Sequence, residues 1–340
     1  MAWAKKALHW QNSNHRFQSE TMQKLNWKIR GRIFDPSEHK LPLDCHSYAQ
    51  SPQALIFDDF VRIYFSSRYT DSPGNFISRI AYIDMDHDFT KILNISVQAV
   101  LSEPELGAYD EHGIFPLHIF REEEKIFGYI CGISRRQSVS VESSIGLSES
   151  FDGGNTFIRK GIGPVLTSSL HEPFLVCDPF VVKEGDTYHM WYIYGLRWMR
   201  ETEASKPERV YKIAHATSFD QINWTKEGRT IISDSIDDNE CQALPTVIKH
   251  GGLYHMVFCY RHAFGFKENK SKGYKLGYAI SSDLQNWSRR DELLNLPSVD
   301  GEWDSDMRCY PHLFKLKEKI YLLYNGNEFG KFGFGLAELL

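Results

Sequence analysis

The sequence has few cysteines, no long apolar run and no large excess of charge of either sign. Its six cysteines include no Cys-x-x-Cys pair and no metal-ligand spacing, and free thiols are typical of a reducing compartment. No segment reaches the roughly 18 apolar residues of a transmembrane helix, and the first residues lack the apolar core of a signal peptide. A formal net charge of -5 indicates no surface for nucleic acid or membranes. We therefore expect a cytoplasmic protein with neither kind of partner.

Five prolines divide the chain into repeats of almost equal length. They are spaced 64, 63, 66 and 66 residues apart, and each leads into an apolar run typical of a β-strand. Thirteen residues after each proline stands an aromatic residue in a second strand-like run, and a small residue marks a third run where backbones can pack closely. The three repeated positions are Pro52, Pro116, Pro179, Pro245 and Pro311; Phe65, Tyr129, Tyr192, Phe258 and Tyr324; and Ala81, Gly146, Ala214, Gly277 and Gly335.

The fourth run of the repeat indicates how the chain closes on itself. It follows an Asn-Trp template, seen at Trp224 and Trp287, but the last repeat ends at Leu340 before its own copy. The missing copy stands at the other end of the chain, around Trp27 in residues 25–34. The sequence therefore predicts an all-β, five-bladed β-propeller with four-stranded blades, the last one closed by this N-terminal strand. A pair of β-sandwiches, the alternative fold, explains neither the period nor the displaced strand.

We predict a single propeller domain of residues 25–340, preceded by an extension of residues 1–24 that carries no repeat mark. Repeat proteins commonly exceed the usual domain length as one unit, so two domains are not required. The blades are expected at residues 45–101, 109–166, 174–232, 240–294 and 306–340.

Acidic residues occupy two aligned positions at the start of the inner strands. Asp178 is the only carboxylate directly before a repeated proline, and Glu111, Glu240 and Asp306 stand five residues before one. In an extended strand these two positions share a side, so the four carboxylates are expected at one mouth of the channel. Crowded carboxylates differ in pKa, as acid–base chemistry on a glycosidic bond requires. One acid alone is more often solvated or a strand cap, but the alignment of four favours a shared site.

Basic, amide and aromatic side chains are predicted at the same mouth. Arginines suit phosphate or carboxylate recognition, and they are equally suited to neutralise the acids. Trp198, in a loop, is the best candidate to stack on a sugar. His312 could ligate a channel cation, but a lone histidine is more often structural, so we predict no metal or cofactor. The substrate-binding candidates beside Trp198 are Asp44, Arg68, Glu111, Arg197, Arg261, His262, Arg308 and Asn327.

The repeat, the Asp178-Pro179-Phe180 segment and the turns before Trp224 and Trp287 resemble the five-bladed propeller superfamily of glycoside hydrolase families 32, 43, 62, 68 and 130. The resemblance covers nearly the whole chain from residue 25 onward. The segment of residues 303–311 and the ending of residues 325–337 are most similar to glycosidase-like proteins of bacterial surface-polysaccharide synthesis.

The resemblance also implies roles for single residues. Asp178 would orient the substrate and tune the acid, and Glu240, followed by Cys241, would be the general acid. The chain departs from the family pattern at two points. Ser51 stands where the family has a first-blade aspartate, with Asp44 the nearest acid upstream, and Glu240 lies five rather than two residues before its proline.

Two classes of function follow from these observations. The first is a carbohydrate-active enzyme that hydrolyses or transfers a glycosyl unit, with Glu240 as acid, Asp178 as tuning carboxylate, and Asp306 or Glu111 as base or sugar ligand. Its substrate would be a carbohydrate or a nucleotide sugar. The alternative is a non-catalytic sugar-binding or scaffold propeller in polysaccharide biosynthesis, which the serine at position 51 favours.

Overall fold

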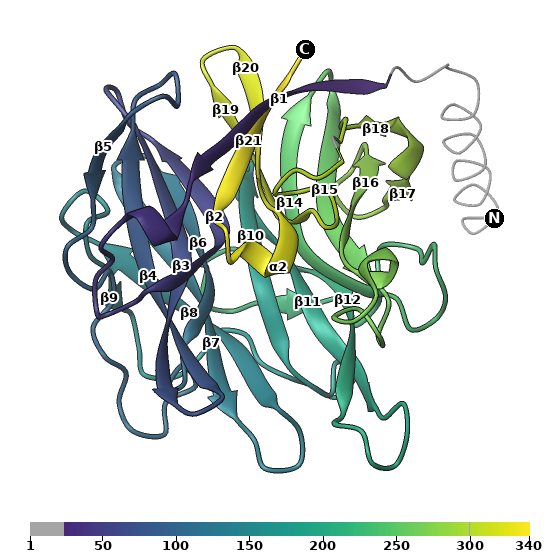
Figure 1. Cartoon of the computed structure of the whole chain (residues 1–340). Helices are drawn as coiled ribbons and strands as arrows, with labels where there is room; N and C mark the ends of the chain where they lie inside the picture. Colours follow the sequence, from purple (N-terminus) through teal and green to yellow (C-terminus); the bar gives the residue numbers. More distant parts are fainter. Residues whose placement is uncertain (1–23, 299) are drawn as a thin grey trace.

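The chain folds into five β-sheets that stand as blades around a central axis (Figure 1). The computed structural model describes residues 24–298 and 300–340. The main strands of each blade pair antiparallel, because runs rich in β-branched and aromatic residues alternate with turns. Within the described residues no helix combines the length and the apolar character needed to cross a membrane. The predicted five-bladed, all-β propeller is confirmed.

Four of the blades each consist of four consecutive strands, with the inner strand first in the chain. Their strands are β2 (Ser47–Ile56), β3 (Val61–Ser72), β4 (Asn75–Met85) and β5 (Ile92–Ile95) in blade 1; β6 (Ile114–Glu122), β7 (Lys125–Arg135), β8 (Val141–Ser150) and β9 (Ile158–Arg159) in blade 2; β10 (Val176–Glu184), β11 (Thr187–Met199), β12 (Glu208–Ser218) and β13 (Thr225–Lys226) in blade 3; and β14 (Cys241–His250), β15 (Leu253–Arg261), β16 (Lys275–Ser281) and β17 (Ser288–Arg289) in blade 4.

The fifth blade joins the N-terminal strand to the C-terminal strands. It contains β19 (Cys309–Leu316), β20 (Lys319–Asn325), β21 (Phe334–Leu339), β1 (Leu25–Phe34) and β18 (Leu294–Asn295). Strand β1 lies antiparallel to β21, with Trp27 opposite Leu339, and its first residues pair in parallel with β18. The ring is therefore closed, and β21 has no free edge. The predicted closing strand is confirmed with the same bounds, whereas β18 is an additional strand that the repeat did not predict.

Helical segments among the described residues are short and lie in the connections. They are η1 (Pro36–Glu38), η2 (Lys270–Lys272), η3 (Asp291–Leu293) and α2 (Asn327–Gly330).

Each inner strand is interrupted at its repeated proline. The pairing register between the first and second strands shifts there in all five blades, as between Cys177 and Phe180 in blade 3. In four blades the residue before the proline has a left-handed backbone, which few non-glycine residues adopt. In blade 2 the Phe115-Pro116 bond is cis instead. The four left-handed residues are Ser51, Asp178, Leu244 and Tyr310, with φ of 52°, 57°, 48° and 55°.

The hydrophobic core lies between neighbouring blades, and the third strands contribute the small residues predicted there. A Cβ atom on Gly277 would lie 2.4 Å from the Phe258 ring. On Gly335 it would lie 2.5 Å from Trp303 and 2.7 Å from the carbonyl oxygen of Gly31 in β1. All three distances are far below van der Waals contact. The predicted close approach of neighbouring backbones is confirmed at Gly335, whereas Gly277 makes room for the Phe258 side chain of its own blade.

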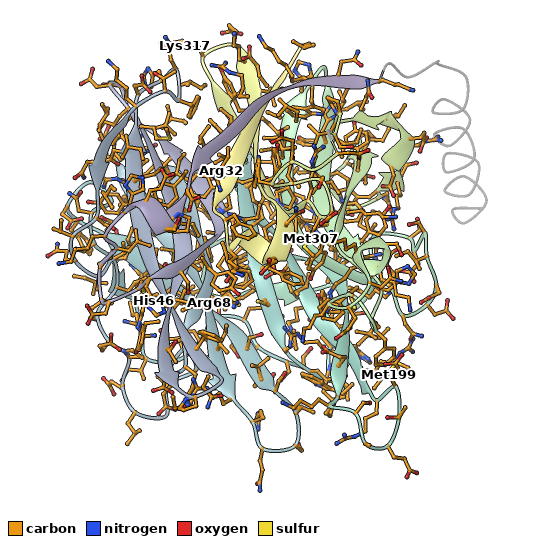
Figure 2. The ribbon with its side chains drawn as sticks, in the orientation of Figure 1. Arg32, His46, Arg68, Met199, Met307 and Lys317 are labelled. Atoms are coloured by element: carbon orange, nitrogen blue, oxygen red, sulfur yellow. The ribbon has the colours of Figure 1, made fainter. Side chains whose placement is uncertain are left out.

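The two ends of the ring differ in their connections. Figure 2 shows Lys317, in the β19–β20 turn, at the top of the view and Met199, at the end of β11, near the bottom. The hairpins that follow β3, β7 and β11 project at the bottom of Figure 1, and we call this end the loop face. Loops of a rigid scaffold commonly carry binding residues, so the loop face is where a site is expected.

Candidate functional site

A cavity of about 90 Å³ lies where the inner strands of blades 2 to 5 approach one another, and we call it the axial cavity. It is on the loop-face side, because the first residues of β8 and β12, next to the long hairpins, form part of its wall. Three of the five residues that precede the repeated prolines line it. The polar and aromatic lining residues are Phe115, Asp178, Arg209, Tyr211, Tyr274 and Tyr310.

Of the residues that the structure describes, Asp178 is the one carboxylate in the wall of this cavity. Its side chain accepts hydrogen bonds from the Cys177 thiol at 3.1 Å and from the Leu244 backbone N–H at 3.1 Å. Burial in a poorly solvated site disfavours the charged form and raises the pKa of Asp178 to about 6, even though both hydrogen bonds and the charge of Arg209 act in the opposite direction. Asp178 is therefore an acid that can hold or release a proton near neutral pH.

One arginine lines the cavity and two more lie beside its aromatic wall residues, and none of the three forms an ion pair within the described residues. Arg209 lines the cavity, and its Nη1 donates to the Ser140 hydroxyl at 3.3 Å. Arg261 is almost fully buried, donates from Nη1 to the carbonyls of His262 and Ala263, and has no partner for Nε among the residues described. Arg68 stacks over the Tyr48 ring at 4.5 Å. Burial lowers the pKa of Arg68 despite the nearby Tyr310 and Tyr48.

Aromatic rings form the rest of the wall. The hydroxyl groups of Tyr211 and Tyr274 are hydrogen-bonded to each other, and the rings of Phe115 and Tyr310 meet edge to face at 5.2 Å. Burial raises the pKa of both Tyr211 and Tyr274, so they stay neutral hydrogen-bonding groups at physiological pH. A wall of rings and hydroxyls around a carboxyl group matches the amphipathic faces of a sugar.

Glu240 does not line the axial cavity. Its carboxylate is fully buried and forms an ion pair with Arg289 at 2.6 Å. It also accepts hydrogen bonds from the backbone N–H groups of Ser235 and Ile236 at 2.9 and 3.0 Å. Gln242 adds a hydrogen bond at 3.1 Å. With its lone pairs occupied in this way, the side chain fastens the outer strand β17 to the start of the inner strand β14.

Asp306 lies in a separate, open groove of about 260 Å³ between blades 4 and 5. It forms an ion pair with Lys270 at 2.6 Å. Tyr274 lines both this groove and the axial cavity, so the two are neighbours. Asn327 accepts the backbone N–H groups of Asp306 and Met307 through its Oδ1, which orders the segment that carries Asp306.

The remaining predicted residues lie outside the wall of the axial cavity. Arg308 also lines the groove and pairs with Asp304 at 2.8 Å. Arg197 donates to the side chain of Asn239 at 2.7 Å, and Glu111 lies 3.8 Å from His112. Asp44 is exposed with a left-handed backbone, and His262 is partly buried. The prediction that Trp198 lies in a loop is wrong: it belongs to strand β11, is paired with Arg209, and packs against the cluster around the cavity.

His312 follows the repeated proline of blade 5 in the inner strand β19, at the register shift. It is nearly fully buried, its ring lies 6.1 Å from Phe180, and Phe180 in turn contacts His118 at 4.6 Å. Burial lowers the pKa of both His118 and His312 to about 3, so both are neutral. Among the residues that the structure describes, no group of three or more histidine, cysteine, aspartate or glutamate side chains is arranged to hold a metal ion.

The sequence reasoning missed Arg209, Tyr211 and Tyr274 as site residues. All three precede or begin third strands, β12 in blade 3 and β16 in blade 4, immediately after the variable loops of the loop face. The repeat could have found them, because the start of a third strand reaches the same end of the ring as the start of an inner strand.

Comparison with solved structures places the fold among the five-bladed propellers of glycoside hydrolases. A structure of BT0996 in an RGII complex matches with a TM-score of 0.68 and 16% identity over 92% of each protein. A thermostable family-43 glycoside hydrolase matches with a TM-score of 0.59 and 15% identity, over 86% of this chain and 88% of its own. The Bombyx mori GH32 β-fructofuranosidase matches with a TM-score of 0.57 and 12% identity, over 99% of this chain and 66% of its own. The predicted resemblance is thereby confirmed for the fold.

The chain belongs to the same family as the uncharacterized protein Rv1502 of Mycobacterium tuberculosis strain H37Rv. The two sequences are 31% identical over 315 residues, which cover 93% of this chain and 99% of that protein. The uncharacterized protein MT1551 of strain CDC 1551 matches with the same values. No protein-family model matches the sequence.

Proposed function

We propose that this protein is a carbohydrate-active enzyme that binds a glycosyl unit in the axial cavity and uses Asp178 to move a proton during cleavage or transfer. The observation that carries the proposal is a buried carboxyl group in the wall of that cavity, with a pKa of about 6. An acid–base catalyst works best when its pKa lies near the working pH. Asp178 would give its proton to the leaving glycosidic oxygen in hydrolysis, or take one from an acceptor hydroxyl in transfer.

The proposal gives Asp178 the role that the family resemblance assigned to Glu240. Glu240 is bound to Arg289 and to two backbone N–H groups, so its carboxylate is not free to approach a substrate. Asp306 remains a candidate contact for a longer substrate, because its groove shares Tyr274 with the axial cavity. The GH43_1 enzyme of Xanthomonas citri has been solved with xylose and with xylotriose, and it shares the fold at 16% and 15% identity. These complexes support a carbohydrate ligand for the present protein.

Turnover by the Asp178→Asn variant tests this proposal. A panel of methyl and 4-nitrophenyl glycosides would first identify a substrate pair that the wild-type protein cleaves. If Asp178 is the acid, the variant should lose roughly 10²- to 10⁴-fold in kcat on the methyl glycoside and much less on the 4-nitrophenyl glycoside, whose leaving group needs no proton. Asp58→Asn, in the exposed turn between β2 and β3, is the matched control. Equal losses on both substrates, or none, in a folded variant would exclude this role.

Transfer from a nucleotide sugar is the second reaction that the proposal admits. A thermal-shift screen with nucleotide sugars separates it from hydrolysis, because a ligand that binds the folded state raises the Tm. A role in polysaccharide biosynthesis stays a proposal supported by the sequence resemblance, and a cytoplasmic location stays one supported by the six free cysteines.

A non-catalytic sugar-binding propeller is the second candidate function. One specific observation favours it: among the described carboxylates, Asp178 alone lines the axial cavity, whereas glycoside cleavage commonly uses two. Isothermal titration calorimetry with the panel sugars would detect binding without turnover. In that case Asp178→Asn would change the affinity for the sugar, and neither protein would show turnover.

A further inference from the structure

The charges around the axial cavity do not balance. Asp178 contributes one carboxyl group, while Arg209 is in the wall and Arg261 lies directly behind it. The Tyr211 ring, which also lines the cavity, has the guanidinium of Arg209 at 5.9 Å from its centroid and that of Arg261 at 5.5 Å. Two positive groups therefore share one aromatic ring of the cavity wall.

The carboxyl group of Asp178 does not neutralise these arginines by contact. Its two oxygens are engaged by the Cys177 thiol and the Leu244 backbone N–H, and it forms no ion pair with either arginine in the described part of the chain. Arg209 also lies next in sequence to Glu208, which is 3.5 Å from Lys267 instead.

A structural explanation for Arg261 is available, and it does not extend to Arg209. Arg261 lies over the Phe266 ring at 3.5 Å and donates to two backbone carbonyls, so stacking and hydrogen bonds support it in place. Arg209 is partly exposed, its ring contacts are 5.9 Å or longer, and its side-chain hydrogen bond is a 3.3 Å contact with Ser140. Its guanidinium is thus positioned at the cavity and largely uncommitted.

A guanidinium with free donors recognises planar or tetrahedral anions through paired hydrogen bonds. Arg209 lines the axial cavity itself, so an anion that its guanidinium binds lies in that cavity. The anion would therefore belong to the unit that enters the cavity.

We propose that the glycosyl unit bound in the axial cavity carries an anionic substituent, a carboxylate or a phosphate, and that Arg209 determines this specificity with Arg261 behind it. The inference rests on the proposed function, because it assumes that the cavity binds a sugar. It adds the substrate class: an acidic glycan or an acidic sugar rather than a neutral one.

Calorimetric titration of the full chain with matched sugars tests this inference. Glucuronate and galacturonate supply the carboxylate, glucose 6-phosphate supplies the phosphate, and glucose and galactose are the neutral parents. An acidic sugar should bind at least about tenfold more tightly than its parent, and Arg209→Gln should weaken binding of the acidic sugar by a larger factor than binding of the neutral parent, so that the preference is lost. Arg121→Gln, on an exposed site at the end of β6, is the matched control and should keep the preference.

The outcomes separate this inference from the function on which it rests. If neutral and acidic sugars bind the wild-type protein equally, or if Arg209→Gln keeps the preference, the cavity is not selective for anions and the inference is wrong. If inorganic phosphate binds as tightly as glucose 6-phosphate and displaces no sugar, the arginines bind a free anion only, which also overturns it. If no sugar of any kind binds, the proposed function itself fails. Arg209→Lys keeps the positive charge and is the control for misfolding of the Arg209→Gln variant. It should retain part of the preference for acidic sugars.

Discussion

The backbone N–H of Leu244 donates a hydrogen bond to Oδ2 of Asp178 at 3.1 Å. The two residues occupy the same repeat position, directly before a proline, in neighbouring blades, and both have left-handed backbones. The contact therefore ties the carboxyl group to the inner strand of blade 4 and fixes it in the cavity wall. A side chain held by a strained backbone in two adjacent blades is preorganised before any ligand arrives.

The raised pKa of Asp178 predicts how stability depends on pH. The folded state binds a proton more tightly than the unfolded state, so wild-type stability should fall as the pH rises from about 4 to about 6. Asp178→Asn removes this titration. Relative to wild type, the free energy of unfolding of the variant should rise by up to about 3 kcal/mol between pH 4 and pH 7. This is the free energy that corresponds to a pKa shift from 3.8 to about 6. Urea unfolding across this range measures it, and a constant difference between the two proteins would contradict a raised pKa.

The buried contacts of Glu240 predict a structural rather than a chemical defect on mutation. Glu240→Gln leaves Arg289 without its charge partner in a buried site, so we expect a loss of about 3 to 5 kcal/mol in the free energy of unfolding. Glu184→Gln breaks a pair with Lys249 that is exposed to solvent, so it should change the stability little. Denaturant midpoints compare the two. A Glu240→Gln protein that is as stable as wild type but has no turnover would contradict this structural role and indicate that Glu240 is catalytic.

Closure of the ring depends on the packing of Trp27. The side chain is only 4% exposed and belongs to the cluster between blades 4 and 5. Trp27→Ala should therefore destabilise the protein by about 3 to 5 kcal/mol and loosen β1 from β21. Val97→Ala, at a residue that is 91% exposed, is the control. Hydrogen exchange should show faster exchange in β1 and β21 of the Trp27 variant, and unchanged protection would mean that other contacts hold the blade closed.

Gly335 should tolerate no side chain, although other blades have alanine at the same repeat position. A Cβ atom there would meet the Gly31 carbonyl oxygen at 2.7 Å and Trp303 at 2.5 Å, so Gly335→Ala should lower the free energy of unfolding by about 1 to 3 kcal/mol. The reverse change Ala214→Gly, in blade 3, has no such clash to relieve and tests the effect of backbone freedom alone. A thermal melt of the two variants measures the difference, and a neutral Gly335→Ala would show that β1 shifts easily.

The sequence predicted the propeller well because each repeated residue marks the same strand in every blade. Each proline marks an inner strand, and the displaced Asn-Trp template located β1 with its observed bounds. The sequence predicted the grouping of the acids poorly. It placed Glu240 and Asp306 in extended strands with Asp178, but β14 begins at Cys241 and β19 at Cys309, so both acids lie in the preceding loops. Strand alternation does not apply there, and the bulge at each proline breaks it within the strands as well.

The most direct measurement of the central claim is a crystal structure of the Asp178→Asn variant with a bound acidic sugar from the titration series. The account predicts that the sugar lies in the axial cavity, with its anomeric oxygen within hydrogen-bond distance of residue 178 and its anionic group at Arg209. A sugar bound only in the groove beside Asp306, or on the opposite end of the ring, would contradict it.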